Sequence, residues 1–160
     1  ISALGGQGGG VLADWLIEIA EAEDDIAQSP PVPGVAQRTG ATIYYLEFFP
    51  RAAALRAGRD PVMALMPVAG DVDCVLASEL AEAGRAIQRG LVTPDRTTLI
   101  ASSHRAYAIG EKSEMGQGAV DTEKITELIR SREKRLVLFD MEETAEGSES
   151  DLRAGLFDAL

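Results

Sequence analysis

Short apolar runs that alternate with amphipathic helical patterns constrain the fold of this chain more than any other feature. The runs "DVDCVLA", "TTLIAS" and "RLVLFD" are continuous rather than alternating, as in strands buried on both faces. Helical spacing of apolar residues lies between them. Such strands joined by helices build a parallel sheet covered on both sides. We therefore predict an α/β fold, doubly wound and Rossmann-like, with a mostly parallel sheet, helices on both faces and a β-hairpin insertion.

The hairpin is expected around residues 42–66. The run "TIYYLEFF" is rich in β-branched and aromatic residues, which favours one strand, and "PVMALM" is expected to pair with it antiparallel. A short strand at 26–28 precedes a loop rich in proline and glycine. Ser78 is expected to cap the helix that follows "DVDCVLA". Further helices are expected at 121–134 and 148–160.

Ligands of open α/β sheets bind beyond the carboxyl ends of the parallel strands. The sequence places four short segments at that edge, and loop 33–40 could reach it. These segments are residues 5–10, 78–79, 102–104 and 140–141.

The first segment, "GGQGGG", stands directly before a helical pattern. Gly8, Gly10 and Ala13 formally satisfy the dinucleotide fingerprint G-x-G-x-x-A, but Gln28 and Ser29 stand where its acidic residue belongs. The Walker A pattern fails, since no Lys-Ser or Lys-Thr follows. Besides a dinucleotide, two interpretations stay open. Backbone N–H groups at the helix start hold another ligand or a partner, or the loop is a tight turn that packs helix on strand.

Other candidates carry weaker signals. Glu79 faces the ligand edge in this interpretation, whereas Glu82 is expected to pair with Arg85. His104, the only histidine, follows two serines, so a nucleophile and base are one interpretation. A structural or interface hydrogen bond is the favoured one.

The composition of the stretch "PGVAQRTGATIYY" is explained less well by a structural role than that of any other stretch. Gln37, Arg38 and Thr39 lie between Gly34 and Gly40. An arginine held between glycines suits recognition of a carboxylate, a phosphate or a partner protein. A solvated turn is the alternative, and the sequence favours neither.

Composition excludes several functions. The net charge of −11 argues against nucleic acid and anionic membrane surfaces, which both attract Lys and Arg. The single cysteine, Cys74, permits no internal disulfide and no cysteine-based metal or iron–sulfur site within the chain, and we expect it to be a small hydrophobe buried in mid-strand. A reducing, cytoplasmic setting fits this composition. No apolar run is long enough to span a bilayer.

Two of these stretches together carry a family signal. "GGQGGGVLADWL" and "VPGVAQRTGATIYYLEFFP" resemble the gamma-type domain of 2-oxoacid:ferredoxin oxidoreductases. The stretch from "PVMALM" to "AIGEK" is similar to indolepyruvate ferredoxin oxidoreductase beta subunits. The motifs G-G-Q-G, Q-R-x-G and S-E-x-x-E-A-G-R occur in the family's order, which is more specific than any one of them. The resemblance covers roughly residues 3–118 and continues more loosely to the end.

The resemblance implies a function in a multi-subunit complex. Family members oxidatively decarboxylate aryl 2-oxoacids such as indolepyruvate to acyl-CoA and reduce ferredoxin. Residues 1–160 would form a single gamma-type domain, accessory to the catalytic centre. Thiamine diphosphate and iron–sulfur clusters would lie in partner domains or an alpha subunit, with no cofactor held by this domain alone and CoA at the interface. The predicted cofactor-facing residues are Gly5, Gly6, Gln7, Gly8, Gln37, Arg38, Thr39, Gly40, Glu79 and His104.

Two rival functions stay open, a stand-alone NAD- or flavin-binding reductase and a purely structural interaction domain. Pairing of two copies through "TIYYLEFF" stays open as well. "ISAL" is typical of the end of a strand, and "LRAGLFDAL" stops inside a helical pattern. We therefore expect the chain to be part of a longer one.

Overall fold

A five-stranded sheet forms the centre of the molecule, with the strand order β3-β1-β5-β6-β7. The computed structural model describes residues 1–30, 41–105, 122–131 and 135–147. The parallel strands are β1 (Ser2–Leu4), β5 (Cys74–Ala77), β6 (Thr98–Ser102) and β7 (Leu136–Phe139). The edge strand β3 (Ala41–Ile43) pairs antiparallel with β1. The prediction of a mostly parallel sheet is therefore confirmed.

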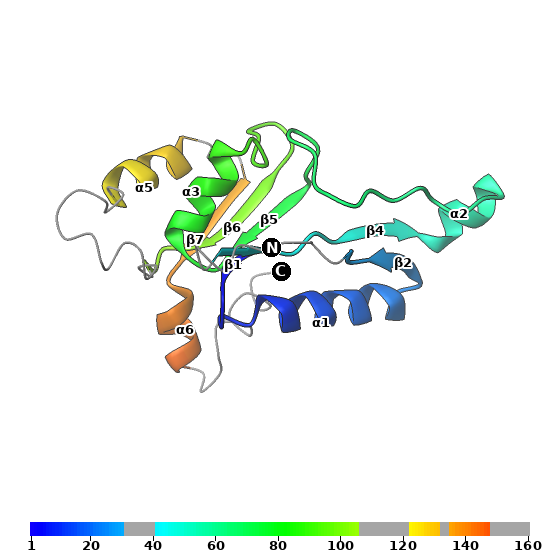
Figure 1. Ribbon diagram of the computed structural model, residues 1–160, viewed down its shortest axis with the longest axis horizontal. Helices are drawn as coiled ribbons and strands as arrows, with labels where there is room; N and C mark the ends of the chain where they lie inside the picture. The colour runs from blue at the N-terminus through cyan, green and yellow to red at the C-terminus, as the bar shows by residue number, and fades with distance from the viewer. Residues whose placement is uncertain (31–40, 106–121, 132–134, 148–160) are drawn as a thin grey trace.

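Helices cover both faces of this sheet (Figure 1). The helices α3 (Leu80–Gln88) and α5 (Thr122–Arg130) lie on one face, and α1 (Gly9–Ala22) and α6 (Met141–Gly147) lie on the other. Side chains along a strand alternate between the two faces. Val75 and Leu99 accordingly join the core under α3 and α5, whereas Leu76 and Ile100 join the core with residues of α1 and α6. The continuous apolar runs follow from this double covering, which confirms the doubly wound fold.

Close packing joins α3 to α5. Ile125 and Ile129 are buried and Leu128 is half-buried, so they form the inward face of the helix that was expected at 121–134. A Cβ on Gly84 would lie 3.1 Å from Cγ2 of Ile125, so the glycine lets the two helices approach. The expected cap at Ser78 is wrong by one residue. Glu79 is the N-cap, because its carboxylate accepts a hydrogen bond from the Glu82 amide.

The predicted hairpin has a different construction. β2 (Asp25–Gln28) and β4 (Glu47–Pro50) form a separate antiparallel two-stranded sheet, followed by α2 (Arg51–Ala57). The expected single strand 42–49 is divided between the two sheets, and 61–66 forms no strand. The amide and carbonyl of Ala64 are instead bound by side chains of the small sheet, Glu47 at 2.5 Å and Gln28 at 2.8 Å.

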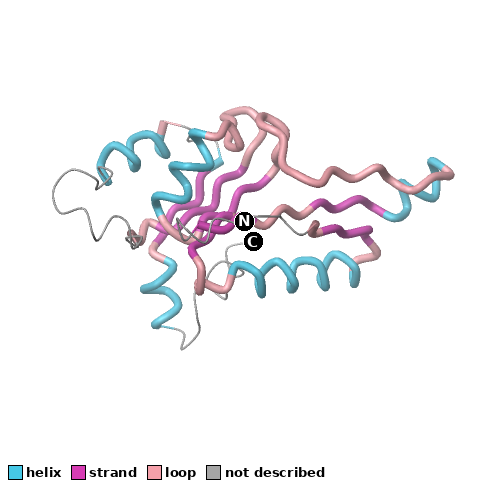
Figure 2. The backbone as a smooth tube through the Cα atoms, in the orientation of Figure 1, coloured by secondary structure: helices cyan, strands magenta, loops and turns pink. Residues whose placement is uncertain are grey.

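We call residues 25–28 and 47–68 the arm. It projects from the main sheet, with α2 at its tip and α1 lying alongside (Figures 1 and 2).

Other predicted elements also need correction. The sequence predicted no helix at 141–147, yet α6 begins directly after β7 because Oδ1 of Asp140 accepts hydrogen bonds from the Glu142 and Glu143 amides at 3.0 and 3.1 Å. The helix expected at 148–160 lies outside the described residues. No helix in the described part of the chain is long and apolar enough to cross a membrane.

Candidate functional site

The carboxyl ends of β1, β5, β6 and β7 meet at one edge of the sheet, which we call the carboxyl edge. The structure brings there the glycine loop, the start of α3 and the segment that follows β6. Gln37, Arg38, Thr39 and Gly40 lie outside the described residues, so their predicted role as a ligand loop stays a prediction.

The glycine loop is a tight turn that needs glycine at two positions. Gly6 has φ +91° and Gly8 has φ +75°, a left-handed conformation that costs other residues more than glycine. The Gln7 amide closes the turn with a hydrogen bond to the Leu4 carbonyl at 3.1 Å. Gly8 is the N-cap of α1 and provides no side-chain cap. The first amides of α1 therefore lack a capping oxygen from their own N-cap residue.

Tyr44 packs against two further glycines and requires glycine at the first of them, Gly9. A Cβ on Gly9 would lie 2.8 Å from Cε2 of Tyr44 and 2.9 Å from Cβ of Ala3, and one on Gly10 would lie 3.4 Å from the same ring. The Tyr44 amide donates to the Ile1 carbonyl at 2.8 Å, which holds the ring beside β1. This contact joins the glycine loop to the stretch "TGATIYY". Sequence analysis missed the role of Tyr44, although glycines beyond those needed for the turn are a signal of close approach.

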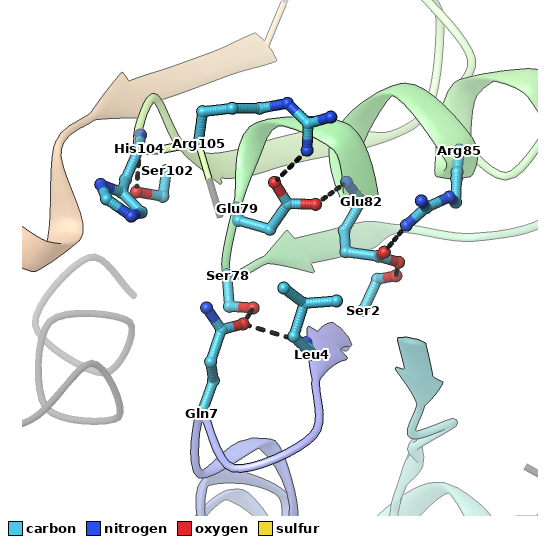
Figure 3. Close-up of polar contacts among 10 residues, drawn as sticks. All are labelled: Ser2, Leu4, Gln7, Ser78, Glu79, Glu82, Arg85, Ser102, His104 and Arg105. Carbon is cyan, nitrogen blue, oxygen red and sulfur yellow. Dashed lines mark hydrogen bonds and ion pairs between the residues drawn. The ribbon is translucent and has the colours of Figure 1, made fainter. Parts of the chain in front are cut away.

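Gln7 connects the loop to the neighbouring strand (Figure 3). Its Oε1 accepts hydrogen bonds from the Leu4 amide at 2.9 Å and from the Ser78 hydroxyl. The Ser78 amide in turn donates to the Ser2 carbonyl at 3.0 Å. The amide oxygen of Gln7 therefore fixes the loop against the end of β5.

Two buried carboxylates lie at the start of α3 (Figure 3). Glu79 was expected to face the ligand edge. It lies at that edge but is only 1% exposed, so its carboxylate is buried in the protein. It accepts from the Glu82 amide at 2.9 Å and pairs with Nη1 of Arg105 at 3.2 Å. Burial raises the pKa of Glu79, against the lowering effects of a backbone hydrogen bond and Arg105.

Glu82 links α3 to the first strand. It is fully buried and accepts a hydrogen bond from the Ser2 hydroxyl at 2.8 Å, while its other oxygen pairs with Arg85. The expected pair of Glu82 with Arg85 is confirmed. Glu79 and Glu82 together explain the S-E-x-x-E-A-G-R motif as a scaffold around the end of β5.

His104 and Ser102 are close, but they do not form a nucleophile and base. The Ser102 hydroxyl oxygen accepts from the backbone amides of His104 at 3.1 Å and Met141 at 3.2 Å. The imidazole points elsewhere, and its Nδ1 lies 2.6 Å from Oε2 of Glu142. Glu142 is missing from the residues predicted for the site, although Asp140 followed three residues later by Glu143 is a signal for the start of a helix.

Cys74 is exposed, not buried in mid-strand as expected. The strand begins at Cys74, which places the thiol at the opposite end of the sheet from the glycine loop. There it contributes to a cavity of about 490 Å³ at the base of the arm. Among the described residues, no group of three His, Cys, Asp or Glu side chains is arranged to hold a metal ion.

Comparison with protein families decides the class of this chain. Residues 1–156 match the family model described as pyruvate ferredoxin/flavodoxin oxidoreductase. The chain belongs to this family. A comparison with curated proteins found no match, and neither did one with solved structures.

Membership of the pyruvate ferredoxin/flavodoxin oxidoreductase family agrees with the resemblance drawn from the three motifs. The sheet also disfavours a dinucleotide site. The dinucleotide-binding fold places a second parallel strand beside the first, with an acidic residue at its end. In this member of the family the antiparallel β3 lies there, and β2, which ends at Gln28, belongs to the arm.

Proposed function

We propose that this chain is the gamma-type part of a thiamine diphosphate-dependent 2-oxoacid:ferredoxin oxidoreductase of the indolepyruvate type. In this role it supports the oxidative decarboxylation of an aryl 2-oxoacid to acyl-CoA, while the catalytic centre lies in its partner. The family match over residues 1–156 supports the oxidoreductase class. The similarity of the stretch from "PVMALM" to "AIGEK" supports the indolepyruvate type.

The observation that carries the accessory role is the exposed apolar surface of the arm. Large apolar side chains are normally buried, and a cluster of exposed ones marks an interaction surface. The arm and the adjoining face of α1 hold most of the exposed large apolar side chains among the described residues. They are Trp15, Ile19, Phe48, Leu55, Val62, Leu65, Met66 and Val68, and Val62 is 97% exposed. A partner subunit that binds to this surface would shield these apolar side chains from water.

The cofactors of the reaction are assigned to the partner. An iron–sulfur cluster needs about four cysteine ligands, and this chain has one cysteine. Neither half of the thiamine pyrophosphate motif, G-D-G and a distant N-N, was found in the sequence. Ferredoxin would then be reduced by the alpha subunit, which holds thiamine diphosphate and the clusters.

CoA is the ligand that we place at the carboxyl edge. The start of α1 presents backbone N–H groups where phosphate groups bind well. Arg38 would add a bidentate contact to a phosphate or carboxylate. Both interactions would bind an anionic ligand such as CoA at the interface with the partner. This chain would hold no cofactor by itself.

Co-expression with a thiamine-bearing alpha subunit tests this proposal. We expect the two chains to co-purify, and a thermal shift with CoA to exceed that with NADH or FAD. A ligand present at 100 times its Kd stabilises a protein by about 2.7 kcal/mol. A shift with NADH or FAD for the chain alone would favour the rival reductase. Co-purification without any shift would favour a purely structural domain.

A further inference from the structure

His104 stands at the carboxyl edge as part of an oriented pair. Its Nδ1 lies 2.6 Å from Oε2 of Glu142, and the two side chains are 32% and 45% exposed. Glu142 belongs to the first turn of α6, whose start is fixed by the Asp140 cap. The pair thus joins the segment after β6 to the helix after β7.

One buried hydroxyl group holds both halves of this pair in place. Ser102 is fully buried, and its Oγ accepts from the backbone amides of His104 and Met141. The Ser103 amide donates to the Phe139 carbonyl at 2.8 Å, and the His104 carbonyl accepts from the Leu80 amide at 2.9 Å. Four hydrogen bonds therefore position the backbone on either side of the imidazole and carboxylate.

This geometry selects one tautomer of the imidazole. When Glu142 accepts a hydrogen bond from Nδ1–H, the neutral ring carries its lone pair on Nε2. The ring of His104 points away from Glu79 and Arg105 (Figure 3). Glu79 is enclosed and engaged, whereas a third of the His104 side chain remains accessible. Nε2 is therefore a hydrogen-bond acceptor on a ring that Glu142 orients through Nδ1. An imidazole that serves as a general base is oriented in the same way.

We propose that Nε2 of His104, oriented by Glu142, accepts a hydrogen bond and then a proton from a thiol or hydroxyl group of the ligand at the carboxyl edge. The inference rests on the proposed function, which supplies a thiol in the form of CoA. In the step, the S–H bond breaks and an N–H bond forms at Nε2. The electron pair stays on sulfur, so no oxidant or reductant is needed.

The proposed reaction needs a base that takes the proton from the thiol of CoA, and His104 with Glu142 would provide it. A free thiol has a pKa of about 8.5, so at neutral pH most of it is protonated and weakly nucleophilic. A positioned base that takes up the proton accelerates such a step by about 10²- to 10⁴-fold. The carboxylate of Glu142 keeps the ring oriented while Nε2 takes up the proton.

The test uses the complex of this chain with its thiamine-bearing alpha subunit and CoA as the probe. His104→Ala and His104→Gln are compared with wild type for oxoacid-dependent acceptor reduction, with CoA varied and absent. We expect the CoA-dependent kcat to fall at least about 100-fold while the CoA-independent step keeps its wild-type rate. Free imidazole should partly restore His104→Ala, since the accessible site admits it.

Two further variants separate orientation from charge and folding. Glu142→Gln should give a smaller loss than His104→Ala, because the amide oxygen still accepts from Nδ1–H. Asp73→Asn removes a carboxylate from an exposed ion pair, Arg96 with Asp73, at the end of β5 opposite the carboxyl edge, and serves as the matched control with wild-type kinetics. Thermal melting and co-purification confirm that each variant folds.

The outcomes distinguish the inference from the proposed function. Wild-type kcat and KM for CoA in both His104 variants would overturn the inference and leave the proposed function standing. An equal loss in the CoA-independent step, without rescue by imidazole, would show a structural role only and also overturn it. A wild-type complex without oxoacid-dependent activity would overturn the proposed function, and the inference would fall with it.

Discussion

Gly9 and Tyr44 are packed so closely that a methyl group on Gly9 would meet the tyrosine ring at 2.8 Å. Gly9 opens α1, and Tyr44 follows the antiparallel edge strand β3. The contact therefore fixes the distance between the glycine loop and the stretch that leads out of residues 37–40.

Gly9→Ala should destabilise the chain although alanine favours helices. The helical preference gains up to about 1 kcal/mol, while overpacking against Tyr44 costs typically about 1–3 kcal/mol. We expect a net loss of about 1 kcal/mol in the free energy of unfolding, measured by urea titration. Gly10→Ala, whose Cβ would lie at 3.4 Å, should be milder. In a Tyr44→Ala background the penalty at Gly9 should shrink to the part caused by Cβ of Ala3, which would lie at 2.9 Å, and an additive cycle would contradict the contact with Tyr44.

Glu82→Ala should lower stability more than any exposed carboxylate does. The substitution removes a fully buried group and leaves Ser2 and Arg85 without their partner. Breaking a buried pair costs about 3–5 kcal/mol, and the partial exposure of Arg85 reduces this to about 2 kcal/mol. Glu18→Ala on exposed α1 is the control and should change stability by less than about 0.5 kcal/mol. Equal effects in urea unfolding would contradict the scaffold role of Glu82.

Glu79 gives a pH dependence with a defined sign. Burial raises its pKa above the ordinary value of 4.5, so the folded chain holds this proton at a pH where the unfolded chain has released it. The stabilising contribution is therefore present below pH 4.5 and is lost as the pH rises through the folded pKa.

Glu79→Gln should gain stability relative to wild type as the pH rises above 4.5, since glutamine cannot ionise. Urea unfolding of both proteins from pH 4.5 to pH 8 measures the difference, and Glu18→Gln controls for general charge. A difference that stays constant or shrinks with pH would show that Arg105 outweighs burial.

The apolar arm predicts where the partner docks. The double substitution Val62→Asp with Leu65→Asp should abolish co-purification with the alpha subunit and leave the free chain about as stable as wild type, because both side chains are largely exposed. Ala69→Asp adds the same kind of charge just outside the arm and should leave assembly unchanged. If all three substitutions weaken co-purification alike, net charge rather than the arm governs assembly.

Arg38→Ala should lower turnover or assembly without loss of the fold, since a bidentate contact to an anionic group would be removed. Circular dichroism and thermal melting check the fold, and Arg130→Ala, at an exposed position in the last turn of α5 and outside the arm, is the matched control. Wild-type assembly and activity in Arg38→Ala would remove the ligand role from this loop.

The sequence predicted the sheet better than the site. Continuous apolar runs indicate burial on both faces, and the alternation of Val75 and Leu76 between the two cores shows why. The division of "TIYYLEFF" could not be foreseen, because its two halves pair with different partners, β1 and β2. Local propensity carries no information about that choice.

The polar contacts of the candidate site depend on distant pairs. Gln7 meets Ser78, and His104 meets Glu142, only after the parallel strands are aligned. Glu79 was placed at the right edge from its strand end, but its burial depends on Arg105 and the packing of α3. Strand ends thus predict which residues share an edge, and tertiary packing decides which of them remain accessible.

Reconstitution of the oxidoreductase with and without this chain tests the central claim most directly. The thiamine-bearing alpha subunit is assayed for oxoacid-dependent ferredoxin reduction in the presence of CoA, with indolepyruvate, phenylpyruvate and pyruvate as substrates. We expect that activity requires this chain and is greatest with the aryl 2-oxoacids. The same activity without the chain would contradict its role in the oxidoreductase, and a preference for pyruvate would contradict the indolepyruvate type.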